Sequence, residues 1–203
     1  SVEPQTIMQD FIETFKNGVE ILRSTPEIYG SEIQRATWWR FWQFAVIGIL
    51  ISGIVSTLAS TIIQVLEAMS QSNNLFIAEP APYPSLFMIL ATPVVIIPLN
   101  LIALYIGVYA SHRFVTSNRA GRGSFVAHSY AIILPVVTAI LIGDVATLVF
   151  SFAPLLSLLL FIALTILWIY SMYVAAQGLA IVHSIDIVSG YWTVAVLAIV
   201  EIV

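Results

Sequence analysis

The sequence predicts an all-α membrane protein, a bundle of five transmembrane helices preceded by an amphipathic interfacial helix. Of the 203 residues, 60% are hydrophobic and only 9% are charged, whereas a soluble domain carries about a quarter charged residues. The apolar residues gather in uncharged runs long enough to cross the roughly 30 Å hydrocarbon core of a bilayer. The cations fall on alternate connections between these runs. Together these observations exclude an ordinary soluble domain.

The first 40 residues are predicted to be a cytoplasmic lead built around one amphipathic helix. Its apolar side chains recur at helical spacing, with polar residues on the other face: Ile7, Met8, Phe11, Phe15, Val19 and Leu22. Such a helix either lies in the headgroup layer of a bilayer or docks in a groove on a partner. We expect it to lie on the membrane or pack on the protein itself, because apolar stripes usually find a core. Tryptophans at the entry to the first span predict an interfacial belt: Trp38, Trp39 and Trp42.

Residues 41–203 are predicted to form the membrane domain. The five expected spans are residues 41–66, 86–111, 125–150, 155–182 and 191–203. The fifth has only thirteen residues, which at about 1.5 Å per residue do not cover a full crossing. We therefore expect a short or tilted last span, or a chain that continues past Val203.

The cations predict the direction of these spans. They lie before the first span and between the second and third, and none follows the first or the third: Lys16, Arg23, Arg35, Arg40, Arg113, Arg119 and Arg122. Because Lys and Arg are enriched in cytoplasmic connections, we expect a multi-pass protein of the plasma membrane with a cytoplasmic N-terminus.

Composition and motifs also limit the chemistry. The formal net charge of −4 argues against the broad basic surface that nucleic acid requires. The chain has no cysteine, which excludes disulfides and thiolate ligands. It also lacks an HExxH motif, a phosphate-binding glycine loop and a Ser–His–Asp signature in its usual context. We therefore predict no catalytic residue, metal or cofactor, and interpret residues 121–124 as a loop ending in the N-cap Ser124.

Two stripes of small residues predict close helix contacts. They recur at four-residue spacing in the first and third spans: Gly48, Ser52, Ser56 and Ser60, then Ala139, Gly143, Thr147 and Ser151. Small residues let helix backbones approach closely in lipid. Internal packing is the simpler interpretation, and a homodimer or a docking face for another subunit is the alternative. The sequence leaves both open.

Two polar residues lie within the predicted spans. Asn100 in the second span requires a hydrogen bond, either between helices or to a substrate. Asp144 is the ionisable residue clearly inside a span, which by default makes it a functional candidate. Because it lies about two turns from the outer end, we interpret it as a polar anchor or a partner for another subunit.

Three histidines map to the cytoplasmic ends of three different spans: His112, His128 and His183. Imidazole is a common metal ligand, so a shared metal or pigment site is one hypothesis. The sequence lacks a close spacing such as HxxxH. The simpler interpretation is that each is a separate interfacial histidine.

Several loose motifs resemble the Yip1-domain family of integral membrane proteins, in particular its prokaryotic members. One is the turn Gly121-Arg122-Gly123-Ser124-Phe125 with Tyr130 and Pro135, and another is Trp168 followed by Gln177-Gly178-Leu179, His183 and Ile185. The resemblance covers residues 5–203. It implies a five-span helical fold with a cytosolic N-terminus. Eukaryotic members are linked to Rab GTPases, vesicle traffic and membrane shaping, whereas prokaryotic members have no settled activity.

These observations predict a non-enzymatic integral membrane scaffold or membrane-organising protein, working as an accessory subunit of a larger membrane complex. Its expected partners are the lipid bilayer and either other membrane subunits or further copies of itself. One alternative is a small transporter or channel that uses Asn100 and Asp144 as polar waypoints. Another is a membrane subunit that binds a cofactor or pigment through His112, His128 or His183.

Overall fold

The computed structural model describes residues 6–23, 26–72, 86–153 and 156–202, and this part of the chain contains helices and no strand. The helices are α1 (Ile7–Leu22), α2 (Pro26–Gln34), α3 (Trp38–Ser72), α4 (Leu86–Asn118), α5 (Phe125–Phe150), α6 (Ser157–His183) and α7 (Ile187–Ile202). The all-α prediction is thereby confirmed.

Three helices among the described residues are long and apolar enough to cross a membrane: Trp38–Met69, Phe125–Phe150 and Ser157–His183. The structure is thus compatible with a membrane protein but does not support the five spans that we expected. α7 has 16 residues, which amount to about 24 Å of helix and fall short of the hydrocarbon core. α4 has 33 residues, but many side chains in its first half lie outside the described part of the chain, and its second half includes the polar His112 and Arg113.

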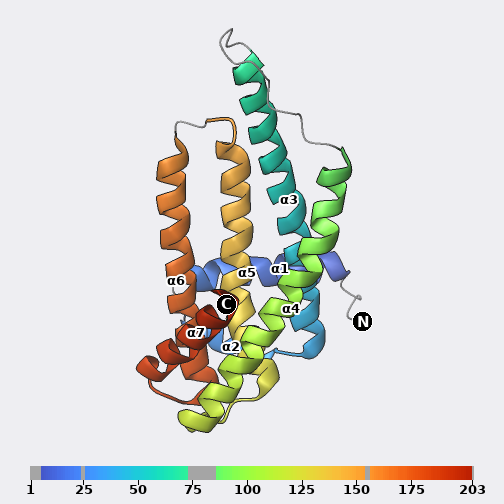
Figure 1. Cartoon of the computed structure of the whole chain (residues 1–203). Coiled ribbons are helices and arrows are strands. Elements are labelled where there is room, and N and C mark those ends of the chain that lie inside the picture. Colours follow the sequence, from blue (N-terminus) through green and yellow to red (C-terminus); the bar gives the residue numbers. More distant parts are fainter. Residues whose placement is uncertain (1–5, 24–25, 73–85, 154–155, 203) are drawn as a thin grey trace.

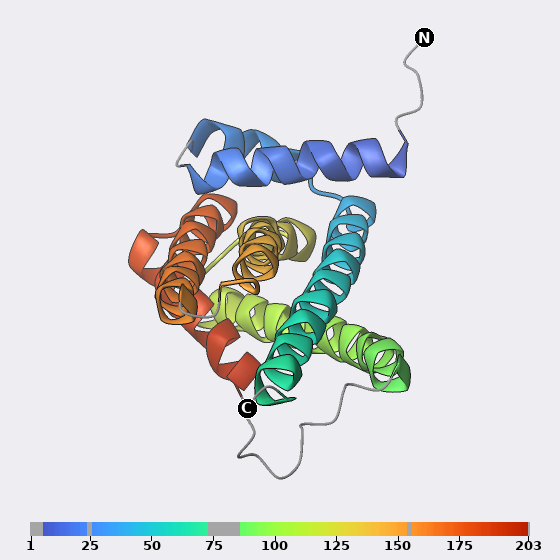
Figure 2. The ribbon, with the colours of Figure 1, turned by 90° about the horizontal axis from the view of Figure 1, so that it is seen from above.

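The long helices α3 to α6 run side by side, and α1 lies across them (Figure 1). Seen from above, α5 stands in the middle, with α1 and α2 along one edge (Figure 2). We call the end of the bundle where α3 and α5 begin and α4 and α6 end the proximal end. There, the rings of Trp38 and Phe125 lie 5.4 Å apart, and Trp42 stacks on Tyr105. Trp39, which belongs to the predicted aromatic belt, is exposed.

The core of the protein is the first half of α5. Residues 128–139 are buried without interruption, as expected for a helix that is apolar on every side and enclosed by other helices. The side chain of Ser124 accepts a hydrogen bond from the Ala127 N–H, which confirms Ser124 as the N-cap. The last turns of α5 are more open, and Val145 and Val149 are exposed.

α1 is amphipathic, as its sequence predicts. It begins with a capping box in which Thr6 and Gln9 bond reciprocally to each other's backbone N–H. One face is buried against α3 and α5: Phe11 packs on Phe44, and Gly18 lies against Thr138. The Gln43 side chain donates a hydrogen bond to the Ile7 carbonyl, which fixes the first turn of α1 on α3.

α2 inserts Tyr29 between α5 and α6. Its hydroxyl donates to the Ala131 carbonyl of α5, and burial raises the pKa of that hydroxyl above its ordinary value. The ring rests on Gly178 of α6, where a Cβ atom would overlap it. Gly178 is therefore required by the close approach of Tyr29.

This contact predicts that Gly178→Ala destabilises the protein. The added methyl group has to displace the Tyr29 ring, and overpacking of this kind costs about 1–3 kcal/mol. Gly30→Ala is the matched control, because a Cβ at Gly30 meets no atom within 4 Å and alanine favours a helix by roughly 0.5–1 kcal/mol over glycine. Thermal unfolding in detergent, followed by circular dichroism, should show a lower midpoint for Gly178→Ala only. Equal midpoints for the two variants would contradict the packing described.

Candidate functional site

A buried carboxylate joins the N-terminal helices to the bundle. Glu32 of α2 is only 2% exposed. Asn17 of α1 donates to its Oε1 over 2.9 Å, and the Tyr130 hydroxyl of α5 donates to its Oε2 over 3.0 Å. A buried ionised carboxylate is tolerated only when it is paired and hydrogen-bonded. These contacts meet that requirement from two different helices.

Two arginines complete the surroundings of Glu32. Arg35 Nη1 lies 3.0 Å from Glu32 Oε1 and 3.1 Å from Glu13 Oε1 on α1. Arg40 Nη1, at the start of α3, lies 3.5 Å from Glu32 Oε2. That nitrogen is buried and makes no well-aligned hydrogen bond. The positive charge of Arg40 is therefore compensated by its ion pair with Glu32. We call Asn17, Glu32, Arg35, Arg40 and Tyr130 the Glu32 cluster.

Sequence reasoning missed this cluster. Arg35 and Arg40 were counted only as cations that orient the spans, and Glu32 was not among the candidates. A single acid in a polar lead is normally a solvated residue, and nothing in the spacing of the sequence shows that α2 turns it inward.

The structure brings the three histidines together at the proximal end. The ring centroids of His128 and His183 lie 5.0 Å apart, as do those of His112 and His128, and His112 and His183 are separated by 5.7 Å. His128 and His183 are buried. The histidines are therefore one cluster rather than three separate interfacial residues.

Their hydrogen bonds form a chain with a fixed direction. The Gly123 N–H donates to His183 Nδ1 over 3.0 Å, so a neutral His183 carries its hydrogen on Nε2. That hydrogen reaches His128 Nδ1 at 2.8 Å, which leaves the hydrogen of a neutral His128 on Nε2, 2.9 Å from Ser111 Oγ. The Ser111 hydroxyl then donates to the Val108 carbonyl over 2.9 Å. Every donor has an acceptor with both rings neutral. We call this set the histidine chain.

The Gly121–Ser124 turn holds the end of the histidine chain. A Cβ at Gly123 would lie 2.7 Å from the Val182 carbonyl oxygen, and one at Gly121 would lie 2.7 Å from His183 Nδ1. The two glycines thus allow the turn to approach His183 closely. His112 Nε2 lies 3.3 Å from the Gly123 carbonyl, on the other side of the same residue. Among the described residues no three histidine or acidic side chains are arranged to hold a metal ion.

The small-residue stripes lie partly at internal contacts. On α3, Gly48 is buried against Val137 and Ser56 donates to Asp144 Oδ1 over 3.0 Å, both on α5. Ser52 is half-buried and Ser60 is exposed. On α5, Ala139 is buried, a Cβ at Gly143 would contact Leu164 of α6, and Thr147 donates to the Gly143 carbonyl.

Asp144 and Asn100 have different surroundings. Asp144 lies at the contact of α5 with α3, where Ser52 and Ser56 are its hydrogen-bonding neighbours, and its buried Oδ2 atom makes no well-aligned hydrogen bond. Asn100 is exposed on α4. Asp144 is therefore the stronger candidate for a functional polar group inside the bundle.

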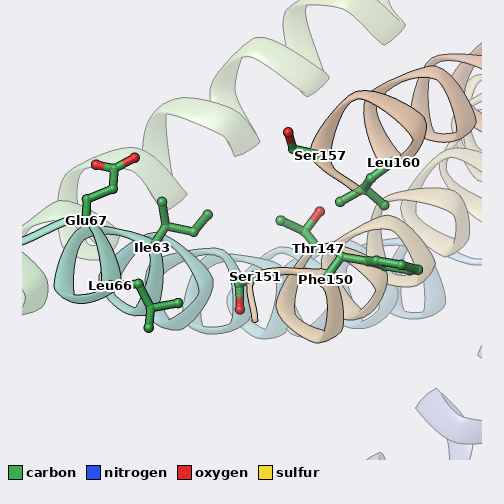
Figure 3. Close-up of a pocket in the computed structure, with 8 residues that line it drawn as sticks. All are labelled: Ile63, Leu66, Glu67, Thr147, Phe150, Ser151, Ser157 and Leu160. Atoms are coloured by element: carbon green, nitrogen blue, oxygen red, sulfur yellow. The ribbon is translucent and has the colours of Figure 1, made fainter. Parts of the chain in front are cut away.

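A cleft of about 350 Å³ lies between α3, α5 and α6 at the end opposite the proximal end (Figure 3). Its walls are mainly apolar, with one carboxylate and three hydroxyl groups among them: Ile63, Leu66, Glu67, Thr147, Phe150, Ser151, Ser157 and Leu160. Thr147 lies three residues beyond Asp144, on the same side of α5. Glu67 and Ser157 were not among the sequence candidates, because a cleft depends on how the helix ends separate.

Comparison with known proteins adds no relative. No protein-family model matches the chain, and neither a curated protein nor a solved structure matches it. The function therefore has to be inferred from the contacts within the molecule.

The Glu32 cluster predicts that Glu32→Gln strongly destabilises the protein. The substitution leaves the buried Arg40 charge without its partner, and breaking a buried pair from one side costs about 3–5 kcal/mol. Glu27→Gln, on the exposed first turn of α2, is the matched control. Thermal unfolding in detergent should separate the two variants clearly. Adding Arg40→Gln to Glu32→Gln should recover part of the loss, and a Glu32→Gln variant as stable as the control would refute the ion-pair account.

The histidine chain predicts that His128→Ala and His183→Ala are not additive. Each variant leaves a buried nitrogen of the other ring without its partner, so the second substitution costs less once the first is made. A double-mutant cycle in chemical denaturant should give a coupling of about 0.5–3 kcal/mol. Substituting His112, whose contact with Gly123 is longer, should couple more weakly to His183. Simple additivity of His128→Ala and His183→Ala would mean that the 2.8 Å contact contributes nothing.

Proposed function

We propose that this protein is a non-enzymatic membrane scaffold that works as an accessory subunit of a larger membrane complex. The observation that carries the proposal is the Glu32 cluster, which ties α1 and α2 to α3 and α5. Satisfied buried polar networks give a protein a rigid and specific geometry. A two-helix layer held in this way keeps one orientation relative to the spans, which is what a positioning subunit requires.

The proposed topology places α3 to α6 across the plasma membrane with the proximal end in the cytoplasm. The support comes from the cations, because Arg113, Arg119 and Arg122 are exposed at or near that end. α4 is proposed as a further crossing on the basis of its 33 residues, and its expected span, residues 86–111, is free of charge. α7 begins after Asp186, whose carboxylate accepts from the Ser189 N–H and hydroxyl, and we propose that it packs along the bundle as an incomplete fifth span.

The resemblance to Yip1-domain proteins stays a prediction from the sequence motifs. It agrees with a membrane-organising role, which we include in the proposal as the alternative way for a scaffold to act. In that case the bilayer and further copies of the chain, rather than foreign subunits, are its partners.

The proposal predicts recovery of the protein in a stoichiometric particle after gentle extraction from its source membrane. Particle mass and chemical cross-links should place partner subunits on the α1–α2 layer. Glu32→Gln should release these partners while the protein stays in the membrane fraction, and the exposed control Glu27→Gln should retain them. Recovery as a monomer with no cross-linked neighbour would contradict the accessory-subunit proposal.

A small transporter is the second candidate, and Asp144 supports it. Its buried Oδ2 atom makes no well-aligned hydrogen bond, and the cleft begins at Thr147, about one turn farther along α5. Ion or solute flux in proteoliposomes separates the candidates, with Asp144→Asn as the test variant and the exposed Val145→Ala as its control. A scaffold gives no flux in any of these proteins. Flux that Asp144→Asn abolishes and Val145→Ala preserves would replace the scaffold proposal.

A further inference from the structure

We infer that α1 is an interfacial helix that inserts one flank into the lipid leaflet beside the bundle, at the level where it crosses Phe44 of α3 and Thr138 of α5. That flank contacts the bilayer at the boundary between the lipid headgroups and the acyl chains. This inference assigns the bilayer surface as a binding partner of α1. It does not depend on whether the protein is also a subunit of a complex.

The first step concerns the buried face of α1 and the polar flank beside it. Its buried face packs on the bundle through contacts such as Phe11 with Phe44 and Gly18 with Thr138. At 3.6 residues per turn, Asn17 and Glu13 fall on one flank of this face. Asn17 donates to Glu32, and Glu13 pairs with Arg35, so the polar flank faces α2.

The second step is the opposite flank, which is apolar. Its residues follow the four-three-four spacing of one helix side: Met8, Ile12, Phe15 and Val19. Met8 is 54% exposed and Ile12 is 45% exposed, while Phe15 and Val19 are half-buried. Ile7, in the first turn, is also exposed. We call Met8, Ile12, Phe15 and Val19 the apolar flank.

The third step is the direction in which the apolar flank points. α1 lies across the long helices, and α2 lies on its proximal side (Figure 1). Because the polar flank faces α2, the apolar flank faces away from the proximal end, along the outer surface of the spans. Beyond Phe44, where α3 contacts α1, α3 exposes the apolar side chains of Leu50 and Ile54. The apolar flank therefore points toward the part of the bundle in which α3 exposes apolar side chains.

The fourth step is that the remaining surface of α1 suits the headgroup region. Lys16 is exposed on the side facing away from the bundle. A lysine there extends its aliphatic stem along apolar surface and keeps its ammonium group in water. Interfacial helices lie in the membrane plane with the apolar side about 5–10 Å below the headgroups. A helix transverse to the spans, with its polar flank proximal and its apolar flank distal, has that arrangement.

The test uses the full chain, which contains no cysteine, so single-cysteine variants carry one label each. Met8→Cys and Ile12→Cys are labelled with a nitroxide and reconstituted into phosphatidylcholine–phosphatidylglycerol vesicles. Lys16→Cys is the matched control on the same helix, and Leu50→Cys is the lipid-facing reference on α3. Electron paramagnetic resonance then compares the accessibility of each label to oxygen with its accessibility to a water-soluble nickel chelate. Unchanged thermal unfolding of each variant establishes that the fold is intact.

The inference predicts an oxygen-to-nickel accessibility ratio at positions 8 and 12 that is severalfold higher than at position 16 and approaches that at position 50. A ratio at positions 8 and 12 equal to that at position 16 would show a flank in water and overturn the inference. Protection of both positions from oxygen as well as from nickel would show that protein covers the apolar flank. In this pure preparation that protein is a second copy of the chain, and this result would also overturn the inference. Neither result changes the expectation that a scaffold subunit is recovered in a stoichiometric particle, so the two proposals are tested separately.

Discussion

The position of the N-terminal helices depends on one buried carboxylate. Glu32 of α2 stands where α1, α3 and α5 meet and receives a hydrogen bond or an ion pair from each of them, and a further ion pair from Arg35 just after α2. A buried charge that loses its partners is strongly unfavourable, so these contacts favour the arrangement of the four helices in which all of them are made. The α1–α2 layer is consequently part of the bundle, and what that layer presents to lipid or protein is fixed by the same contact.

The Glu32 cluster and the histidine chain share α5. Tyr130 and His128 are two residues apart and therefore point to nearly opposite sides of the helix, one toward Glu32 and the other toward His183. The histidine chain joins α4, α5, α6 and the turn before α5, so the two sets together connect all the helices from α1 to α6. Polar contacts at this end hold a bundle whose opposite end consists of apolar helices, a cleft and the partly unsatisfied Asp144.

Composition and periodicity predicted the helices well. Uncharged apolar runs as long as residues 125–150 are typical of helices that are buried in protein or in lipid. They did not distinguish a helix that crosses from one that packs along the bundle, which is why a fifth span was expected where α7 has 16 residues. The candidate site was harder to predict from the sequence. His112, His128 and His183 are far apart in the chain, and their contact depends on helix lengths and on two glycines in one turn. Glu32 was missed because its burial is a tertiary effect.

The most direct test of this account is hydrogen–deuterium exchange of the protein in lipid nanodiscs, compared between the wild type and Glu32→Gln. If Glu32 holds the N-terminal layer on the spans, the amides of α1 and α2 are protected in the wild type and exchange much faster in the variant. The amides in the first half of α5, which other helices also enclose, lose much less protection than those of α1 and α2. Equal protection of α1 and α2 in the two proteins would contradict the central role of Glu32.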